Sequence, residues 1–570
     1  MFDVPITDHA PTVSANQVRT RLRIVLCTHL HQPLYRDAAS GRQVLPWAYL
    51  HALQEYADLT HHLEAAPTAT AVLNLSPVLL EQLGDYGTML SRALRGGPPP
   101  QDPVLALLTP GGRPVDNAAW PPLLRAVLDS APPRIANRYP PYQRLLEMAR
   151  QALANGTSHW LSSGFLRDLA AWHHLAWCGE SAQADERIAA LIAHGLSQGP
   201  VVPARFGEDD LRQLLEVVTD IIVGLVPRWR RLLGTGRVEL SASPWGHPLL
   251  PAMLGTVADL PDLYPGGAGR AKWHLARAQQ AFVEAFGVRS RGGWLPGGAV
   301  CAKSLAALGG FGQAWTLTGE EVIRDSLKAG SPGAALPALI PPRGWRVAGV
   351  PGVVFARHTA LSSLATHYAG WDAARAATNF VEHLARVARE HADDPQAVVA
   401  VVLGGDRADW PDGGFAFLSH LFARLAERDD VEPTTFSAVL AEPDCQAELS
   451  TLVPGSWEPG GFASWVRGPE RATAWRALCG AKRAFDQAVV EGTLDDAAQA
   501  RAELQLAACE AADFPWWLGD ERPALARAAF GALFVAHLRY LYRLLDEPVP
   551  AEVDALVSML PPASDTAVME

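Results

Sequence analysis

Cysteine is scarce in this sequence, and its spacing excludes two kinds of stabilised small domain. The chain of 570 residues has six cysteines, none of which forms a C-x-x-C pair. Neither a zinc knuckle nor a disulfide framework is therefore predicted, and we expect reduced side chains in the core. The six are Cys27, Cys178, Cys301, Cys445, Cys479 and Cys509.

Long hydrophobic runs are also absent. Apolar stretches such as residues 221–226 are far shorter than the roughly 20 apolar residues that a membrane-spanning helix requires. Residues 1–9 show no basic segment followed by an apolar one, which is the pattern of a secretory leader. We therefore expect a cytoplasmic protein without a membrane partner.

Basic residues are outnumbered by acidic ones. With 48 Lys and Arg against 60 Asp and Glu, the formal net charge is −12. A nucleic-acid-binding surface needs concentrated positive charge, so no nucleic-acid partner is predicted and a neutral substrate fits better. Hydrophobic residues at 49% and charged residues at 19% describe an ordinary globular composition.

Tryptophan, in contrast, is abundant, with 18 residues. Large aromatic rings usually lie in the core, but sugar-binding clefts also use them because the apolar face of a pyranose stacks on a flat ring. Composition alone leaves both interpretations open.

Seven short apolar runs predict buried strands, and stretches with helical periodicity lie between them. This alternation is typical of parallel sheets and α/β barrels, and an irregular barrel is the preferred interpretation. The predicted strands are residues 23–28, 70–75, 238–242, 292–295, 313–317, 353–357 and 397–403.

Two further regions are predicted to be helical. The long interval between the second and third strands, around residues 95–230, has Pro- and Gly-rich segments and several helical runs, which indicates an inserted subdomain. Strand signals end near Val431, and a helical C-terminal domain is predicted over 431–560. Its apolar stripe includes His537, which we interpret as a core histidine rather than a ligand. The other predicted parts are an N-terminal extension (1–20), the barrel region (21–430) and a tail (561–570).

Polar and aromatic residues gather where the predicted strands end. His29 and His31 follow the first strand, His247 follows the third, the fourth ends at Trp294, and Trp410 lies in the loop after the seventh. Because the carboxyl ends of parallel strands meet at one face of a barrel, these side chains are predicted to line one cleft.

The His29-Leu-His31 pair has three interpretations. Strand alternation points both imidazoles to the same side, which would suit a divalent metal that has further ligands on later strands. Gln32-Pro33 follows, however, and no clear third and fourth ligand is evident. We therefore favour two histidines that hydrogen-bond a polar ligand, over a metal pair or buried structural histidines, and predict no metal.

Several motifs, taken in chain order from about residue 21 to about residue 546, resemble glycoside hydrolase family 57. Each motif is short, but the ordered set is specific. The motifs are His29-Leu-His31-Gln32-Pro33, Pro46-Trp47, Asn74-Leu-Ser-Pro77, Gly246-His247-Pro248, Gly293-Trp294, Gly455-Ser-Trp457, Trp465-Val-Arg-Gly-Pro-Glu470 and Phe514-Pro-Trp516-Trp517.

The resemblance implies an irregular (β/α)7 barrel with a helical bundle, acting on α-glucans by a retaining mechanism without a cofactor. Such enzymes use two carboxyl groups about 5 Å apart, one as nucleophile and one as acid. The family position of the nucleophile falls on Gly297, and that of the acid falls on Gly404. The resemblance therefore implies a catalytically degenerate homologue that binds α-glucan or regulates its metabolism.

Two alternatives remain. Asp406 and Glu321 are fallback carboxylates for an active retaining hydrolase or 4-α-glucanotransferase, and a protein-interaction scaffold would need neither. The expected ligand is an α-glucan or maltooligosaccharide, and the oligomeric state is not predicted. The predicted substrate-binding residues are His29, His31, Gln32, Trp47, His247, Trp294, Trp410 and Trp465.

Overall fold

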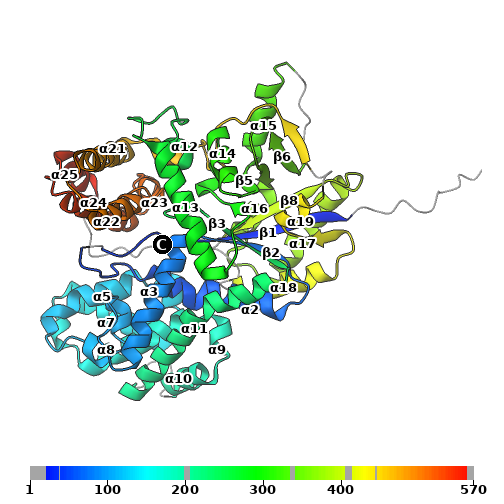
Figure 1. Ribbon diagram of the computed structural model, residues 1–570. Helices are drawn as coiled ribbons and strands as arrows, with labels where there is room; N and C mark the ends of the chain where they lie inside the picture. The colour runs from blue at the N-terminus through cyan, green and yellow to red at the C-terminus, as the bar shows by residue number, and fades with distance from the viewer. Residues whose placement is uncertain are drawn as a thin grey trace, which may run out of the picture.

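A closed barrel of parallel strands forms the centre of the molecule (Figure 1). The computed structural model describes residues 21–37, 39–197, 206–333, 340–404, 414–442 and 446–561. Each barrel strand pairs in parallel with the next, and the last pairs with the first, which closes the barrel. The strands are β1 (Leu22–Leu30), β2 (Ala71–Leu75), β3 (Val238–Ala242), β4 (Gly292–Gly293), β5 (Trp315–Gly319), β7 (Val353–Arg357) and β8 (Val398–Leu403).

All seven predicted strands are present, and the predicted (β/α)7 barrel is confirmed. Burial does not alternate along these strands, because helices cover the outside of the barrel while side chains fill the inside, and β2, β3 and β5 are buried along their whole length. β4 is the shortest, since its glycines make room for a neighbouring ring. A Cβ atom on Gly292 would lie 2.1 Å from the indole of Trp315.

Three short strands were not predicted, and the expectation that strands end near Val431 is wrong. β9 (Val431–Pro433) pairs with β1, β10 (Gln446–Leu449) pairs with β6 (Gly344–Val347), and β6 runs antiparallel to β7. Glu432 and Glu448 are exposed, so neither β9 nor β10 has the continuous apolar run that identifies a buried strand. These strands extend the barrel sheet past Val431, while the domain boundaries themselves stay a prediction.

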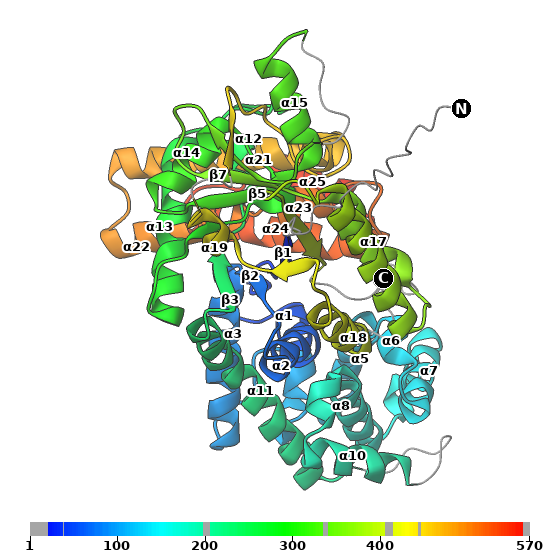
Figure 2. The same cartoon turned by 90° about the vertical axis from the view of Figure 1, so that its right-hand side faces the viewer.

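Helices surround the barrel, as Figure 2 shows for α13, α14, α15 and α17. They follow the strands in the alternation that the sequence indicates, and η1, in the first of these connections, is a π-helix. The elements are α1 (Trp47–His51), η1 (Ala52–Tyr56), α2 (Ala57–Ala65), α12 (Leu250–Met253), α13 (Gly267–Phe286), α14 (Ala302–Gly310), α15 (Glu320–Gly330), α16 (Thr359–Leu364), α17 (Ala373–Glu390), α18 (Phe415–Ala426) and α19 (Phe436–Leu440).

The interval between β2 and β3 is helical, as predicted, and forms the lower part of the molecule in Figure 1. Proline stands in the first turn of several of its helices, where the missing N–H costs nothing. Ser162 caps the helix that follows it by accepting from the Phe165 N–H. The helices are α3 (Pro77–Leu94), α4 (Pro103–Ala106), α5 (Trp120–Asp129), α6 (Pro133–Ala136), α7 (Pro140–Ala154), α8 (Ser163–Trp177), α9 (Glu180–Gln183), α10 (Glu186–Leu196) and α11 (Glu208–Gly234).

A second group of helices, orange and red in Figure 1, packs beside the barrel. It comprises α20 (Ala463–Val466), α21 (Pro469–Glu491), α22 (Asp496–Cys509), α23 (Asp513–Trp517), α24 (Ala524–Leu544) and α25 (Ala551–Met559). In the described part of the chain, α24 alone has the length and composition of a membrane span, and half of its most apolar window is buried within the protein. His537 on α24 is buried and bonded by Gln505, which confirms the prediction of a core histidine.

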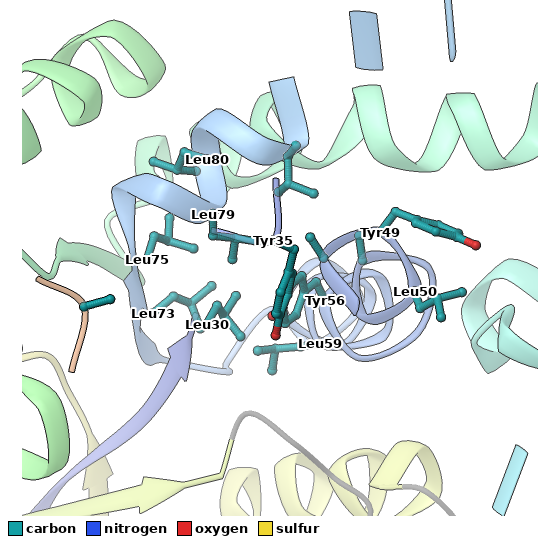
Figure 3. Close-up of a cluster of buried hydrophobic side chains, with 14 of the residues drawn as sticks. Leu30, Tyr35, Tyr49, Leu50, Tyr56, Leu59, Leu73, Leu75, Leu79 and Leu80 are labelled. Atoms are coloured by element: carbon teal, nitrogen blue, oxygen red, sulfur yellow. The ribbon is translucent and has the colours of Figure 1, made fainter. Parts of the chain in front are cut away.

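Buried side chains hold the end of β1 in place. Figure 3 shows a cluster in which Leu30, at the end of β1, and Leu73, in the middle of β2, pack with residues of α3 and of the α1–α2 segment. Tyr35 and Tyr56 belong to this cluster and also bind Gln32, which accepts from the Tyr35 hydroxyl at 2.7 Å. Five cysteines are likewise free and buried, as expected, and Cys445 lies outside the described residues.

Candidate functional site

A pocket of about 550 Å³ opens at the carboxyl ends of the barrel strands. The helical insertion contributes Trp177 and Arg134 to its wall, and the C-terminal helices contribute Asp513 and Phe530. The structure brings nine of the singled-out residues to this pocket, which confirms the prediction of one cleft. They are His29, His31, Gln32, Trp47, His247, Trp294, Gly297, Gly404 and Trp465.

Of the three other singled-out residues, one can be placed. Asp406 and Trp410 lie outside the described residues. Glu321 is exposed in the first turn of α15 and is not among the residues that line the pocket. Of the two fallback carboxylates, therefore, the one that can be placed lies away from the cleft.

His29 is oriented by a hydrogen-bond network at the ends of β2 and β3. Its Nδ1 lies 2.8 Å from Asn74 Oδ1, and this oxygen also accepts from the Ser243 hydroxyl at 2.8 Å. The amide nitrogen of Asn74 donates to Ser241 Oγ at 2.9 Å, and the amide oxygen faces His29. Because Asn74 Oδ1 can only accept, His29 Nδ1 carries the proton and Nε2 is a bare acceptor.

His31 is oriented by a carboxylate from the C-terminal helices. Its Nε2 lies 3.0 Å from both carboxylate oxygens of Asp513, at the start of α23. An ionised carboxylate accepts only, so Nε2 donates and Nδ1 is left bare when the ring is neutral. Sequence analysis missed Asp513 because it lies 482 residues away from its partner.

His247 is held in an unusual backbone conformation. Its φ is 53°, one of two positive values for non-glycine residues in the described chain. Its N–H donates to the Pro244 carbonyl at 2.9 Å, and its carbonyl accepts from the Ala512 N–H at 3.2 Å. Such a conformation costs on the order of 1 kcal/mol and persists only where surrounding contacts enforce it, which is frequent at functional sites. It brings the ring centroid to 4.3 Å from His31 and 4.8 Å from His29.

We call His29, His31 and His247 the histidine cluster. One buried nitrogen on each ring has no hydrogen-bond partner among the described residues: His29 Nε2, His31 Nδ1 and His247 Nε2. Burial lowers the pKa of His29 to about 3, with a further contribution from His31, and the bond to Asn74 opposes this shift. Burial likewise lowers the pKa of His247 well below its usual value. At neutral pH both rings are therefore uncharged and offer lone pairs.

Gly297 leaves no room for a side chain. Its φ is 53°, in the left-handed region that favours glycine. A Cβ atom there would lie 2.5 Å from the Trp465 ring and 2.9 Å from Cγ of Glu458. The Glu458 side chain therefore lies where a residue at 297 would project.

Glu458 itself lines the pocket and was not singled out from the sequence. Burial raises the pKa of its carboxyl, while the positive charges of Arg357 and Arg522 act in the opposite direction. The signal available in the sequence was its place directly after the Gly455-Ser-Trp457 motif. That motif is brought to Gly297 by tertiary contacts, including a hydrogen bond from the Trp457 N–H to the Gly297 carbonyl at 3.0 Å.

Tryptophans form much of the pocket wall, but they differ in exposure. Trp294 is only 1% exposed, and its ring stacks on His29 with centroids 5.5 Å apart. Trp465 is 2% exposed, so both rings pack largely against protein. Half-buried rings, which a sugar could contact more easily, were partly missed. They are Trp47, Trp457, Trp516 and Trp517.

The helical insertion adds a polar edge. Arg134 lines the pocket and binds the π-helix η1 through two nitrogens, one to Gln54 and one to Glu55, each at 2.8 Å. His51, also on the pocket wall, lies 3.1 Å from the second carboxylate oxygen of Glu55. These contacts tie the insertion to the barrel at the rim of the site.

Comparison with known proteins identifies the family to which the sequence is similar. The family model described as Glycosyl hydrolase family 57 matches residues 25–448. No curated protein sequence matches the chain.

Solved structures similar to the chain cover nearly its whole length. A GH57 branching enzyme from Thermococcus kodakaraensis, in complex with glucose, has a TM-score of 0.57 and 16% identity, covering 95% of this chain and 94% of its own. A GH57-type branching enzyme from Pyrococcus horikoshii has a TM-score of 0.57 and 15% identity, and the match covers 94% of both chains. The α-amylase AmyC from Thermotoga maritima has a TM-score of 0.57 and 13% identity, and the match covers 95% of this chain and 96% of AmyC. At this level of identity the likeness shows the shared fold.

Proposed function

This chain belongs to glycosyl hydrolase family 57, and we propose that its pocket binds an α-glucan or maltooligosaccharide without hydrolysing it. The observation that carries the proposal is the combination of a sugar-sized, tryptophan-walled pocket with glycine at both family carboxylate positions, 297 and 404. A retaining glycosidase needs a carboxyl group at each of these places. The chain would then serve α-glucan metabolism as a binding or regulatory protein.

The chemistry of the wall supports a sugar ligand. Half-buried indole rings such as Trp47 and Trp516 offer apolar faces to a pyranose, and the bare nitrogens of the histidine cluster accept hydrogen bonds from hydroxyl groups. Neither interaction requires a nucleophile. Proteins with the same fold are named as branching enzymes and an α-amylase, and one was solved with glucose, which favours a glucan among sugars.

The test separates binding from turnover. Titration calorimetry with maltoheptaose is expected to give a dissociation constant of roughly 10 μM to 1 mM, which corresponds to a binding free energy of about 4 to 7 kcal/mol. A reducing-end-labelled maltooligosaccharide should remain intact on prolonged incubation. A β-linked cello-oligosaccharide of equal length is the matched control ligand. Absence of heat and of any shift in melting temperature at millimolar maltoheptaose would reject the proposal.

A second candidate function is an active retaining hydrolase or 4-α-glucanotransferase with relocated carboxylates. One observation favours it: Glu458 places a carboxylate-bearing side chain beside Gly297, with Cγ 2.9 Å from the virtual Cβ. Burial raises the pKa of Glu458, as is typical of a group that acts as a general acid. Asp513 is a second carboxylate on the same wall, although His31 already binds it.

This candidate predicts measurable cleavage of labelled maltooligosaccharide by the wild-type protein. Glu458→Gln should then abolish cleavage while maltoheptaose still binds, because removal of a catalytic group costs on the order of 10⁴-fold or more in rate. Glu321→Gln, at an exposed carboxylate outside the pocket, is the matched control and should cleave normally. An inactive wild type would eliminate this candidate and leave the binding function.

A further inference from the structure

We propose that the histidine cluster is a binding site for one divalent transition-metal ion of the zinc type. The proposal goes beyond glucan binding: these nitrogens accept hydrogen bonds from the glucan only in the metal-free protein. His29 and His31 come from the end of β1, and His247 comes from the turn after β3. One nitrogen of each ring lies within 4.8 Å of a nitrogen of the other two.

The proton positions favour coordination. Asn74 Oδ1 and the Asp513 carboxylate each accept from the outward nitrogen of one histidine, at 2.8 and 3.0 Å. The other ring nitrogens, His29 Nε2 and His31 Nδ1, therefore carry lone pairs when the rings are neutral, as a metal requires. They are buried, and like His247 Nε2 they have no hydrogen-bond partner among the described residues.

The surroundings resemble those of known metal-binding histidines. A ligating histidine usually donates its second N–H to a carboxylate or carbonyl oxygen, which fixes the ring and its tautomer. Asp513 and Asn74 do this for two of the three rings. The third ring is brought in by the positive φ of His247, a strained conformation that its neighbours enforce through two backbone hydrogen bonds.

The donor set selects the class of ion. Neutral imidazoles suit Zn²⁺, Co²⁺, Ni²⁺ and Cu²⁺, whereas Ca²⁺ and Mg²⁺ prefer oxygen ligands. In a tetrahedral zinc site with bonds of about 2.0 to 2.1 Å, the nitrogens lie roughly 3.3 Å apart, so small ring rotations must close the cluster. The fourth position would face the pocket that all three residues line. Three histidines with one open position is the arrangement of catalytic rather than structural zinc.

The experiment uses the full-length protein after treatment with a chelator. Titration with Co²⁺ should give one ion per chain, a dissociation constant below about 10 μM and the intense visible bands of a low-symmetry site. Zn²⁺ should displace the signal. His247→Ala should weaken binding by at least about 100-fold, and Asp513→Asn, which keeps the side-chain shape, by about 10- to 100-fold.

The matched control is His383→Ala on α17, where a half-buried histidine lies outside the pocket and its Nδ1 binds the Asn379 carbonyl. It should bind Co²⁺ like the wild type. If the wild type takes up no Co²⁺ or Zn²⁺ at 100-fold excess over the chelator-treated protein, or if His247→Ala and Asp513→Asn bind as well as His383→Ala, the proposal is overturned. Maltoheptaose binding by the metal-free protein is measured separately, so that a failure of either proposal leaves the other intact.

Discussion

Two buried polar clusters lie where the barrel meets the C-terminal helices, and they differ in how completely their atoms are paired. One is the histidine cluster. The other, which we call the Glu510 cluster, comprises Tyr264, Arg270, His274 and Glu510. Both contain three or more ionisable side chains, and both join segments more than 200 residues apart.

The Glu510 cluster is saturated with hydrogen bonds. Its carboxylate accepts from the Tyr264 hydroxyl, from Arg270 Nε and Nη2 at 2.8 Å each, and from His274 Nε2 at 2.7 Å. Burial alone would raise the pKa of Glu510, but the charge of Arg270 and the bond from His274 outweigh it and lower the pKa to about 2. A buried charge so fully paired is typical of a structural element.

Two chain segments, around His247 and around Asp513, connect the Glu510 cluster to the histidine cluster. His274 Nδ1 accepts from the Gly246 N–H at 3.2 Å, immediately before His247. Glu510 precedes Ala512, whose N–H binds the His247 carbonyl, and Asp513, which binds His31. The paired cluster thus holds the two turns that position the unpaired one. The difference between the two clusters indicates that unpaired polar atoms in the pocket, and not buried polarity as such, make the histidine cluster the candidate ligand site.

The largest expected effect is on the Glu510 cluster. Glu510→Ala leaves Arg270 buried without its main partner and should lower the free energy of unfolding by about 3 to 5 kcal/mol, measured by urea denaturation. Glu503→Ala is the matched control, because Glu503 also binds Arg270 but is 33% exposed, and it should cost less than about 1 kcal/mol. Equal effects of the two variants would contradict the structural role.

Acid should remove the stabilisation that Glu510 provides. Its pKa is lowered on folding from 4.5 to about 2, so its contribution is complete above pH 4.5 and is lost as the pH falls toward 2. The loss should approach about 3 kcal/mol, since one pKa unit is worth about 1.4 kcal/mol. Unfolding measurements at pH 6 and pH 3 should show the wild type losing more stability than Glu510→Gln. If both proteins lose the same stability between pH 6 and pH 3, groups other than Glu510 determine the acid sensitivity.

Glucan binding should depend on the half-buried tryptophan rings that line the pocket. Trp516→Ala removes a half-buried ring of the pocket and should weaken maltoheptaose binding about tenfold, equivalent to about 1.4 kcal/mol. Trp160→Ala is the matched control, because that ring is 78% exposed and lies outside the pocket lining. Calorimetry that finds the same affinity for both variants would remove Trp516 from the binding surface.

The smallest effect on stability should come from the histidine cluster. His247→Asn replaces a strained residue, whose Nε2 has no partner among the described residues, with one that tolerates positive φ, so the free energy of unfolding should change by less than about 1 kcal/mol. Ligand binding in the pocket should nevertheless be lost. Urea denaturation and calorimetry on the same preparation test both parts. A loss of stability as large as that of Glu510→Ala would show that the histidine cluster also stabilises the fold and would contradict the difference between the two clusters.

Much of the barrel could be predicted because its signals are local. The barrel strands lie in short, largely apolar segments of the sequence, so all seven were found, and residues at the strand ends had to meet at one face. His29 and His247 were placed in one pocket on that basis, and Gly297 was placed there through the family resemblance. The short strands β9 and β10 were missed because they depend on pairing with β1 and β6 and carry no apolar run of their own.

The sequence by itself determined the positions of the barrel strands, the spacing of His29 and His31 at the end of β1, and the absence of carboxylates at positions 297 and 404. The tertiary structure decided which atoms of these residues are paired. It brought Asp513 to His31 and Glu458 to the space beside Gly297, and it bent the backbone at His247. Side chains from distant segments meet only after the barrel and the C-terminal helices have packed together, so local spacing carries no record of these contacts.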